Sequence, residues 1–148
     1  MDTIRITKEF HFEMAHALKG YDGSCRNIHG HSYQMLVTVK GTPILDENNP
    51  KLGMVMDFGD LKKIVNELIV DVFDHAFVLN SSLKMDLIDS LKLNFDKVIV
   101  LNYQPTSELM VIDFANRIKK ALPENILLHS VLLRETGSSY AEWFAEDN

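Results

Sequence analysis

Three shortages in the sequence each exclude a class of protein. The 148 residues include one cysteine, which excludes an intramolecular disulfide and favours a reducing compartment. No apolar run approaches the roughly 18 residues that a membrane-spanning helix needs. Acidic residues outnumber basic ones, 21 to 15, and the formal net charge of −6 argues against a general nucleic-acid-binding protein. Residues 1–9 also lack the apolar core of a signal peptide, so we expect a cytoplasmic protein with neither membrane nor nucleic-acid partners.

The composition is that of an ordinary globular domain. Hydrophobic residues make up 46 % of the chain and charged residues 24 %, and the length suits a single domain covering residues 1–148. Repeats, linkers and low-complexity segments are absent. We therefore expect one hydrophobic core rather than a modular chain.

Two strands with period-two alternation are expected near the N-terminus. In residues 4–17 the apolar phase ends at His16, which should point inward. Residues 29–40 form the second strand, and His29 and His31 extend its apolar phase backwards. A loop rich in turn residues joins the two strands, which favours antiparallel neighbours. This arrangement would bring His16 close to His29 and His31.

The remaining pattern predicts an α+β fold. We expect one helix at 59–73, capped by Asp57 or Asp60, and another within part of 81–97. A third should begin at Pro105-Thr106-Ser107-Glu108 and end at about Leu122. Runs of β-like sequence lie at 98–101, 126–135 and 139–145. The near-continuous apolar character of 126–135 suggests burial on both faces. The order β-β-α-(α)-α-β-β predicts a four-stranded antiparallel sheet with helices.

The strongest chemical signal is the set His16, His29 and His31. Three histidines with a fourth position open to water or substrate are typical of a catalytic zinc site. Gly30 removes a side chain that would crowd the backbone between two of these ligands. The alternative is three unconnected histidines, each hydrogen-bonded in the core.

Two other groups suit proton transfer. Cys25 lies four residues before His29 in a polar loop, where Arg26 and a nearby Zn²⁺ would favour its thiolate as a general base. Its alternative is a small buried hydrophobe. The pair Asp74-His75 follows a helix; it is either a helix C-terminal cap or an imidazole oriented by a carboxylate.

Two glutamates complete the candidate residues. Glu135 ends an apolar strand in the inward phase, and a buried carboxylate is costly unless it is paired. Its partner is either Arg134 or a ligand that presents two N–H donors. Glu108 reads most simply as an acid in the first turn of a helix.

These motifs, taken in order, resemble the 6-pyruvoyl-tetrahydropterin synthase superfamily. They are Phe12-Glu13-Met14-Ala15-His16, Cys25-x3-His29-Gly30-His31, Asp74-His75 followed by Leu79-Asn80, Pro105-Thr106-Ser107-Glu108, and Glu135. The three-residue spacer after Cys25 looks like the bacterial 6-carboxy-tetrahydropterin synthase branch of queuosine biosynthesis. The resemblance implies a tunnelling fold whose four-stranded sheets close a twelve-stranded barrel from three subunits. It also implies that two barrels stack as a homohexamer, with sites between subunits.

The resemblance also implies an activity. The substrate would be 7,8-dihydroneopterin triphosphate, and the products 6-carboxy-tetrahydropterin, acetaldehyde and triphosphate. His16, His29 and His31 would hold Zn²⁺, Cys25 would be the base, and Asp74 with His75 would form a proton relay. Glu135 would accept two N–H bonds from the pterin, with Glu108 nearby. Three alternatives remain: a 6-pyruvoyl-tetrahydropterin synthase, a non-catalytic pterin- or purine-binding module, and an interaction protein whose histidines are core residues.

Overall fold

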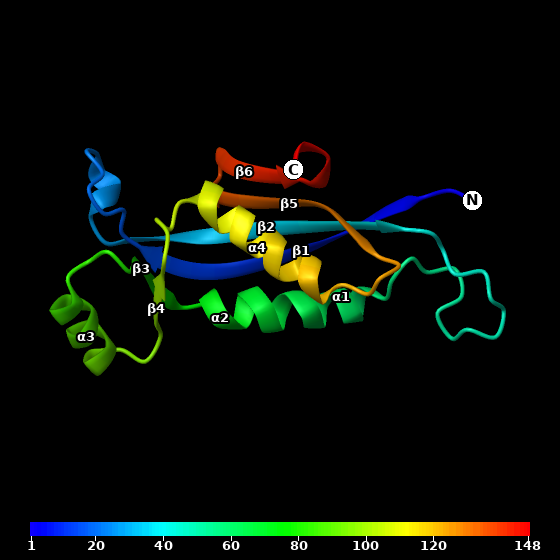
Figure 1. The fold of residues 1–148 in the computed structure, drawn as a ribbon, viewed down its shortest axis with the longest axis horizontal. Coiled ribbons are helices and arrows are strands. Elements are labelled where there is room, and N and C mark those ends of the chain that lie inside the picture. The colour runs from blue at the N-terminus through cyan, green and yellow to red at the C-terminus, as the bar shows by residue number, and fades with distance from the viewer.

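Four long antiparallel strands dominate the computed structural model, which describes residues 1–148 (Figure 1). They are β1 (Ile4–His16), β2 (His29–Gly41), β5 (Leu127–Thr136) and β6 (Ser139–Phe144). Each pairs with the next in the order β1-β2-β5-β6. The expected strands at 4–17, 29–40, 126–135 and 139–145 are therefore confirmed to within a residue or two.

The expected count of four strands is wrong, because the sheet has six. Its order is β4-β3-β1-β2-β5-β6, and the two added strands, β3 (Ala76–Asn80) and β4 (Val98–Leu101), run parallel to their neighbours. β3 pairs with the last three residues of β1, beside His16. Both strands are short apolar runs without period-two alternation. Periodicity therefore could not reveal β3, nor place β4 in the sheet.

One long helical stretch follows β2 as expected, although its middle segment is a π-helix and not an α-helix. α1 (Phe58–Val65) continues through a π-helical segment (Asn66–Val70) into α2 (Asp71–Phe73). The side chain of Asp57 caps it by accepting a hydrogen bond from the Gly59 backbone N–H at 2.7 Å. Of the two expected caps, Asp57 is therefore the one used.

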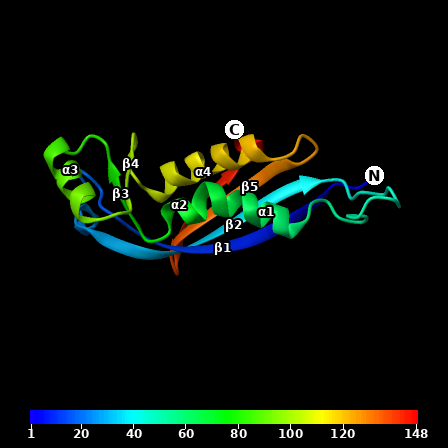
Figure 2. The ribbon, with the colours of Figure 1, turned by 90° about the horizontal axis from the view of Figure 1, so that it is seen from below.

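The other two helices lie at opposite ends of the β3–β4 region. α3 (Met85–Asn94) occupies part of the 81–97 segment, while α4 (Ser107–Ala121) begins at the cap Thr106 and stops before Pro123. Figures 1 and 2 show α3 set apart at one end of the molecule, whereas α4 runs alongside the α1–α2 stretch. The helices are too short and polar for any of them to cross a membrane.

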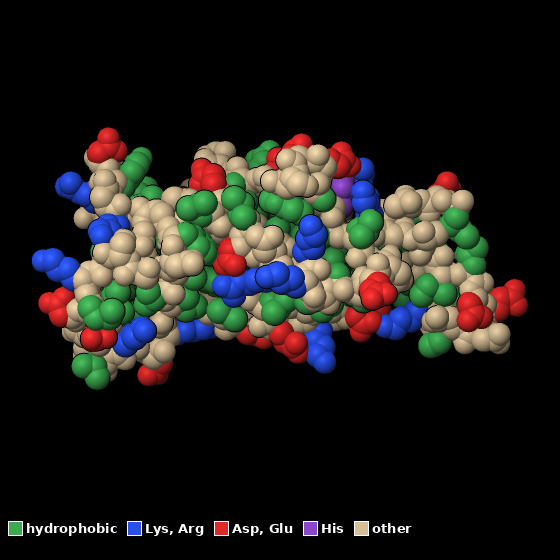
Figure 3. Space-filling model, viewed as in Figure 1, with side chains coloured by type: hydrophobic (Ala, Val, Ile, Leu, Met, Phe, Trp, Pro, Cys, Tyr) green, Lys and Arg blue, Asp and Glu red, His purple; other side chains and the backbone are tan.

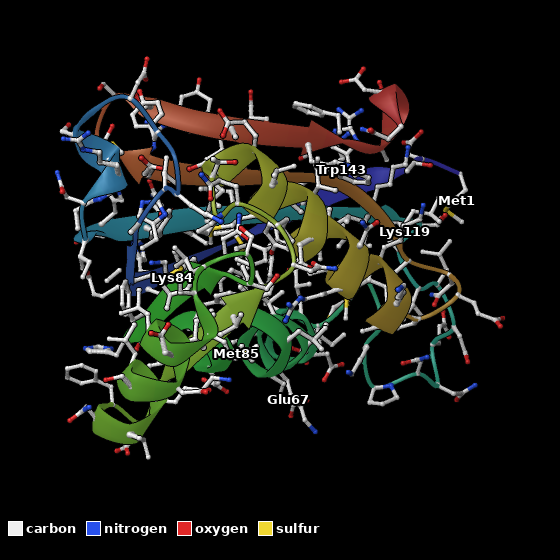
Figure 4. The ribbon with its side chains drawn as sticks, turned by 60° about the vertical axis from the view of Figure 1, so that its left-hand side comes forward. Met1, Glu67, Lys84, Met85, Lys119 and Trp143 are labelled. Carbon is white, nitrogen blue, oxygen red and sulfur yellow. The ribbon has the colours of Figure 1, made fainter.

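The core lies between the α1–α2 and α4 layer and one face of the sheet. Its fully buried members come from both layers, among them Phe12, Met35, Val65 and Phe114. Trp143 of β6 is 8 % exposed and lies where that strand passes α4 (Figure 4). The core residues therefore lie on the helix-covered face of the sheet, and the side chains of His16, His29 and His31 point to the same face.

The opposite, helix-free face is polar and exposed. Thr7, Glu9 and Glu13 of β1 lie there and bond Thr38, Gln34 and Ser32 of β2. The expectation that β5 is buried on both faces is wrong, since Leu132 on this face is only half-buried. On the face seen in Figure 3, Lys and Arg side chains alternate with acidic ones instead of forming one continuous basic surface.

Candidate metal centre and adjoining pockets

Strand pairing brings the three histidines together. His16 lies directly opposite His29 in the β1–β2 register, and Met14 lies opposite His31. One ligand nitrogen from each histidine lies within 4.8 Å of the others. The expected convergence of His16, His29 and His31 is confirmed. A Cβ at Gly30 would lie 3.3 Å from the carbonyl oxygen of Met14, so glycine relieves a tight approach there.

Backbone carbonyls fix the tautomers of two of these rings. Nδ1 of His16 donates to the carbonyl of Pro105, and Nδ1 of His29 donates to the carbonyl of Asn27, both at 2.7 Å. Since a carbonyl only accepts, each ring carries its proton on Nδ1 when neutral. The two Nε2 atoms then present lone pairs to one another at 3.0 Å.

This arrangement fits a cation better than it fits three core histidines. Two facing lone pairs repel unless a positive charge lies beside them. Nε2 of His31 is buried and forms no hydrogen bond, although a carboxylate oxygen of Glu135 lies 3.3 Å away. Burial lowers the pKa of both His16 and His31, which keeps the rings neutral and able to ligate. The three side chains could therefore hold a metal ion, with room left for further ligands.

Glu135 lies beside this cluster. Its Oε1 is 3.3 Å from Nε2 of His31, and its Oε2 accepts a hydrogen bond from the hydroxyl of Ser107 at 2.6 Å. Arg134, one of its two expected partners, turns away and lies 4.4 Å from the ring of Tyr140. Glu135 thus keeps free lone pairs on a carboxylate whose side chain is 26 % exposed.

A pocket of about 420 Å³ joins Glu135 to Cys25. Its lining includes Gln104, Thr106, Ser107 and Glu108 from the start of α4, and Tyr21, Ser139 and Tyr140. Cys25 is half-buried in a single 3₁₀ turn, Ser24–Arg26. Glu108 lies in the first turn of α4, as expected, and faces the same pocket. The chain therefore brings Cys25, Glu108 and Glu135 to one cavity beside the histidines.

The pair Asp74-His75 lies elsewhere. Oδ2 of Asp74 is 2.9 Å from Nδ1 of His75, which has the unusual φ of 60° and a side chain that is 78 % exposed. The other carboxylate oxygen accepts from the backbone N–H of Glu13, which is the main reason that the pKa of Asp74 is lowered; the imidazole of His75 adds to this effect. Both expected arrangements are present, since Asp74 is the C-cap residue of α2 and its carboxylate also orients the imidazole of His75.

His75 lines a second pocket, of about 390 Å³, together with Glu13, Gly30, Ser32 and Phe77. It shares no lining residue with the pocket of Cys25, although His31 of the histidine cluster also lines it. Within one chain, the candidate base and the candidate relay therefore do not meet.

Several contributing residues were missed by sequence reasoning. Ser107, which holds Glu135, and Lys97, whose ammonium bonds the carbonyls of Asp71 and Asp74, carry no motif that reports a long-range contact. Tyr33 did carry a signal, because it continues the inward phase of His29 and His31. Its hydroxyl is buried without a partner, and burial raises its pKa.

The chain matches known proteins over nearly its whole length. A family model described as 6-pyruvoyl tetrahydropterin synthase matches residues 5–146. Relatives that carry the name 6-carboxy-5,6,7,8-tetrahydropterin synthase include proteins from Haemophilus influenzae and Synechocystis. The one from Haemophilus influenzae is 39 % identical over 142 residues, which are 94 % of this chain and 97 % of that protein. The one from Synechocystis is 34 % identical, over 95 % of this chain and 92 % of that protein.

Solved structures share the fold. An uncharacterized Wolinella succinogenes protein superposes with a TM-score of 0.79 at 21 % identity, covering 98 % of this chain and 99 % of that one. The 6-pyruvoyl tetrahydropterin synthase of Caenorhabditis elegans gives a TM-score of 0.66 at 26 % identity, covering 98 % and 97 %.

Proposed function

The chain belongs to the 6-pyruvoyl tetrahydropterin synthase family, and we propose that it is a 6-carboxy-5,6,7,8-tetrahydropterin synthase, a lyase. Its substrate would be 7,8-dihydroneopterin triphosphate, and its products 6-carboxy-tetrahydropterin, acetaldehyde and triphosphate. The convergence of three histidine nitrogens beside a pocket that contains Cys25 and Glu135 carries this proposal. The three-residue spacer between Cys25 and His29 supports a place in queuosine biosynthesis, by resemblance to that branch.

His16, His29 and His31 would hold Zn²⁺. Their neutral Nε2 atoms suit this ion, whose structural and catalytic sites commonly use imidazole nitrogen. The bound ion would supply Lewis-acid polarisation of a substrate oxygen. The carbonyls of Pro105 and Asn27 support the site by holding two of the rings in their ligating tautomer.

Cys25 would remove a proton from the substrate side chain as a thiolate. In the half-buried 3₁₀ turn, its thiol lies in the pocket that would receive that side chain. Asp74 and His75 would then carry the proton onward. Because their pocket is separate within one chain, we infer that they act on the site of a neighbouring copy, as expected for a homohexamer. The open edge strands β4 and β6 support such an assembly, since unpaired edges favour pairing.

Glu135 would anchor the pterin ring. Ser107 fixes one carboxylate oxygen and leaves both oxygens with free lone pairs, so the group can accept two parallel N–H bonds. Glu108, which lies in the same pocket, would contact the ring from the start of α4.

Product analysis tests the proposal. Zinc-loaded protein would be incubated with 7,8-dihydroneopterin triphosphate, and the products would be identified by mass spectrometry. A 6-carboxy product together with acetaldehyde is the expected result. A 6-pyruvoyl product would instead assign the sister activity, and the absence of turnover by metal-replete protein would overturn both.

A further inference from the structure

Four consecutive residues before and at the start of α4 each hold a different part of the Cys25 pocket or of the histidine cluster beside it. The carbonyl of Pro105 orients His16, Thr106 caps the helix, and Ser107 fixes Glu135. The side chain of the remaining residue, Gln104, reaches the loop between β1 and β2. That loop carries Cys25, so Gln104 links the base of the proposed reaction to the other groups.

The carboxamide of Gln104 forms two bonds with a single residue of the loop. Its Nε2 donates to the carbonyl of Lys19 at 2.9 Å, and its Oε1 accepts from the backbone N–H of the same residue at 3.3 Å. A side chain that bonds both polar groups of one residue fixes the orientation of that residue, as a neighbouring strand would. Oε1 also accepts from Nδ2 of Asn80, at 3.1 Å, which holds the amide in this orientation.

Few other bonds hold the loop near Cys25; one of them runs from the ammonium of Lys19 to the carbonyl of Ser82. The backbone N–H of Leu18 donates to the carbonyl of Cys25 at 2.9 Å, so the residue next to the Gln104 contact is tied directly to the cysteine. No residue of the turn Ser24–Arg26 is fully buried, since Ser24 and Arg26 are exposed and Cys25 is half-buried. With such little packing, hydrogen bonds at the base of the loop dominate its placement.

We propose that Gln104 is the positioning residue for Cys25: by bonding both backbone groups of Lys19, it holds the thiol in the pocket beside Glu135. The inference rests on the proposed role of Cys25 as the base. Gln104 itself lines the pocket wall at the loop, and no part of the proposal requires it to exchange a proton.

The substitution Gln104→Leu tests this, because it keeps the size of the side chain and removes all three hydrogen bonds. We expect kcat to fall about tenfold to a hundredfold, as misplacement of a catalytic group does, while KM changes less than about threefold. Zinc content should match that of the wild type. The matched control is Gln34→Leu, at the only other glutamine, which lies on the helix-free face; it should leave kcat within about twofold.

Alkylation gives a second readout that is independent of turnover. Cys25 is the only cysteine, so the rate of iodoacetamide labelling reports on this thiol alone. Release of the loop should raise that rate about fivefold or more in Gln104→Leu at a pH where the thiol is ionised, but not in Gln34→Leu.

Unchanged kcat and an unchanged labelling rate in folded Gln104→Leu would overturn the inference, as would a loss of zinc that accounts for the lost activity. If Gln104→Leu does not fold, Gln104→Glu serves, since it keeps the acceptor and loses the donor to Lys19. If wild-type protein does not turn over the pterin, the proposed function fails, whereas the labelling rate still decides whether Gln104 holds the loop.

Discussion

Cys25 and Glu135 line a pocket next to three buried or half-buried histidines, whereas His75 lines a separate pocket and is 78 % exposed. The first region draws its groups from β1, β2, β5, α4 and the loop between β1 and β2, and hydrogen bonds between these segments hold several of its side chains. The second region is the turn that carries Asp74 and His75. Its imidazole lines a pocket that has no lining residue in common with the pocket of Cys25. The proposed base and the proposed proton relay therefore lie in separate pockets of one chain, and their contributions can be tested separately.

The largest effect should come from removing a ligand in the first region. His16→Ala takes away a nitrogen that strand register, a carbonyl and burial all hold in place. We expect zinc affinity to fall at least about a hundredfold and turnover to be lost. Metal analysis after dialysis measures the first effect, and the product assay measures the second.

A control on the same strand sharpens this result. His11 points to the opposite, helix-free face, where it bonds Glu9 at 2.8 Å. His11→Ala should keep wild-type zinc content. Equal zinc in His16→Ala and His11→Ala would contradict the metal centre.

Mixing two inactive variants tests the division between the regions. Cys25→Ala should keep its zinc and lose about 10²- to 10⁴-fold in kcat, since a general base is gone; His75→Ala should also lose turnover. If Asp74-His75 serves the pocket of another copy, coexpressed variants form some sites with both groups intact. Random mixing should then restore about a quarter of wild-type activity.

The comparison with unmixed protein decides the point. Each variant expressed alone should remain inactive at the same total concentration. Activity of the mixture that is no higher than the mean of the two separate variants would show that the pair acts within one chain or has no part in turnover.

The features that the sequence predicts correctly are those that depend on residues close together in the chain. Period-two alternation placed His16, His29 and His31 on one face, and a single loop between adjacent strands made their meeting predictable. The helix starts at Asp57 and Thr106 carried local cap signals. These inferences depend on neighbours in sequence or in one hairpin, and the structure confirms them.

The errors concern contacts between segments far apart in the chain. β3 runs parallel to β1, and parallel pairing requires a long connection that leaves no turn signature. The bond from Ser107 to Glu135 spans 28 residues, and Gln104 reaches Lys19 across 85. Glu135 has a polar partner, as its burial predicts, but this partner is Ser107; Arg134, the neighbour in sequence that was an equally plausible partner, turns away.

The smallest expected effect is on the stability of metal-free protein at mildly acidic pH. Burial lowers the pKa of His16 and His31 below the ordinary value of 6.5, so the unfolded chain binds protons on these residues that the folded chain does not. Their contribution to the free energy of unfolding is then full above about pH 6.5 and is lost as the pH falls toward the lowered values. The slope is at most about 1.4 kcal/mol per pH unit for each histidine.

Urea denaturation of EDTA-treated protein, repeated between about pH 5 and 8, measures this slope. His31→Asn should flatten it, because one of the buried titrating groups is gone. His75→Ala should not, because that side chain is 78 % exposed and lies outside the buried histidine cluster. If both variants flattened the slope equally, the difference in burial between the two regions would not determine how pH affects stability. The histidine cluster could then not be a desolvated set of neutral ligands.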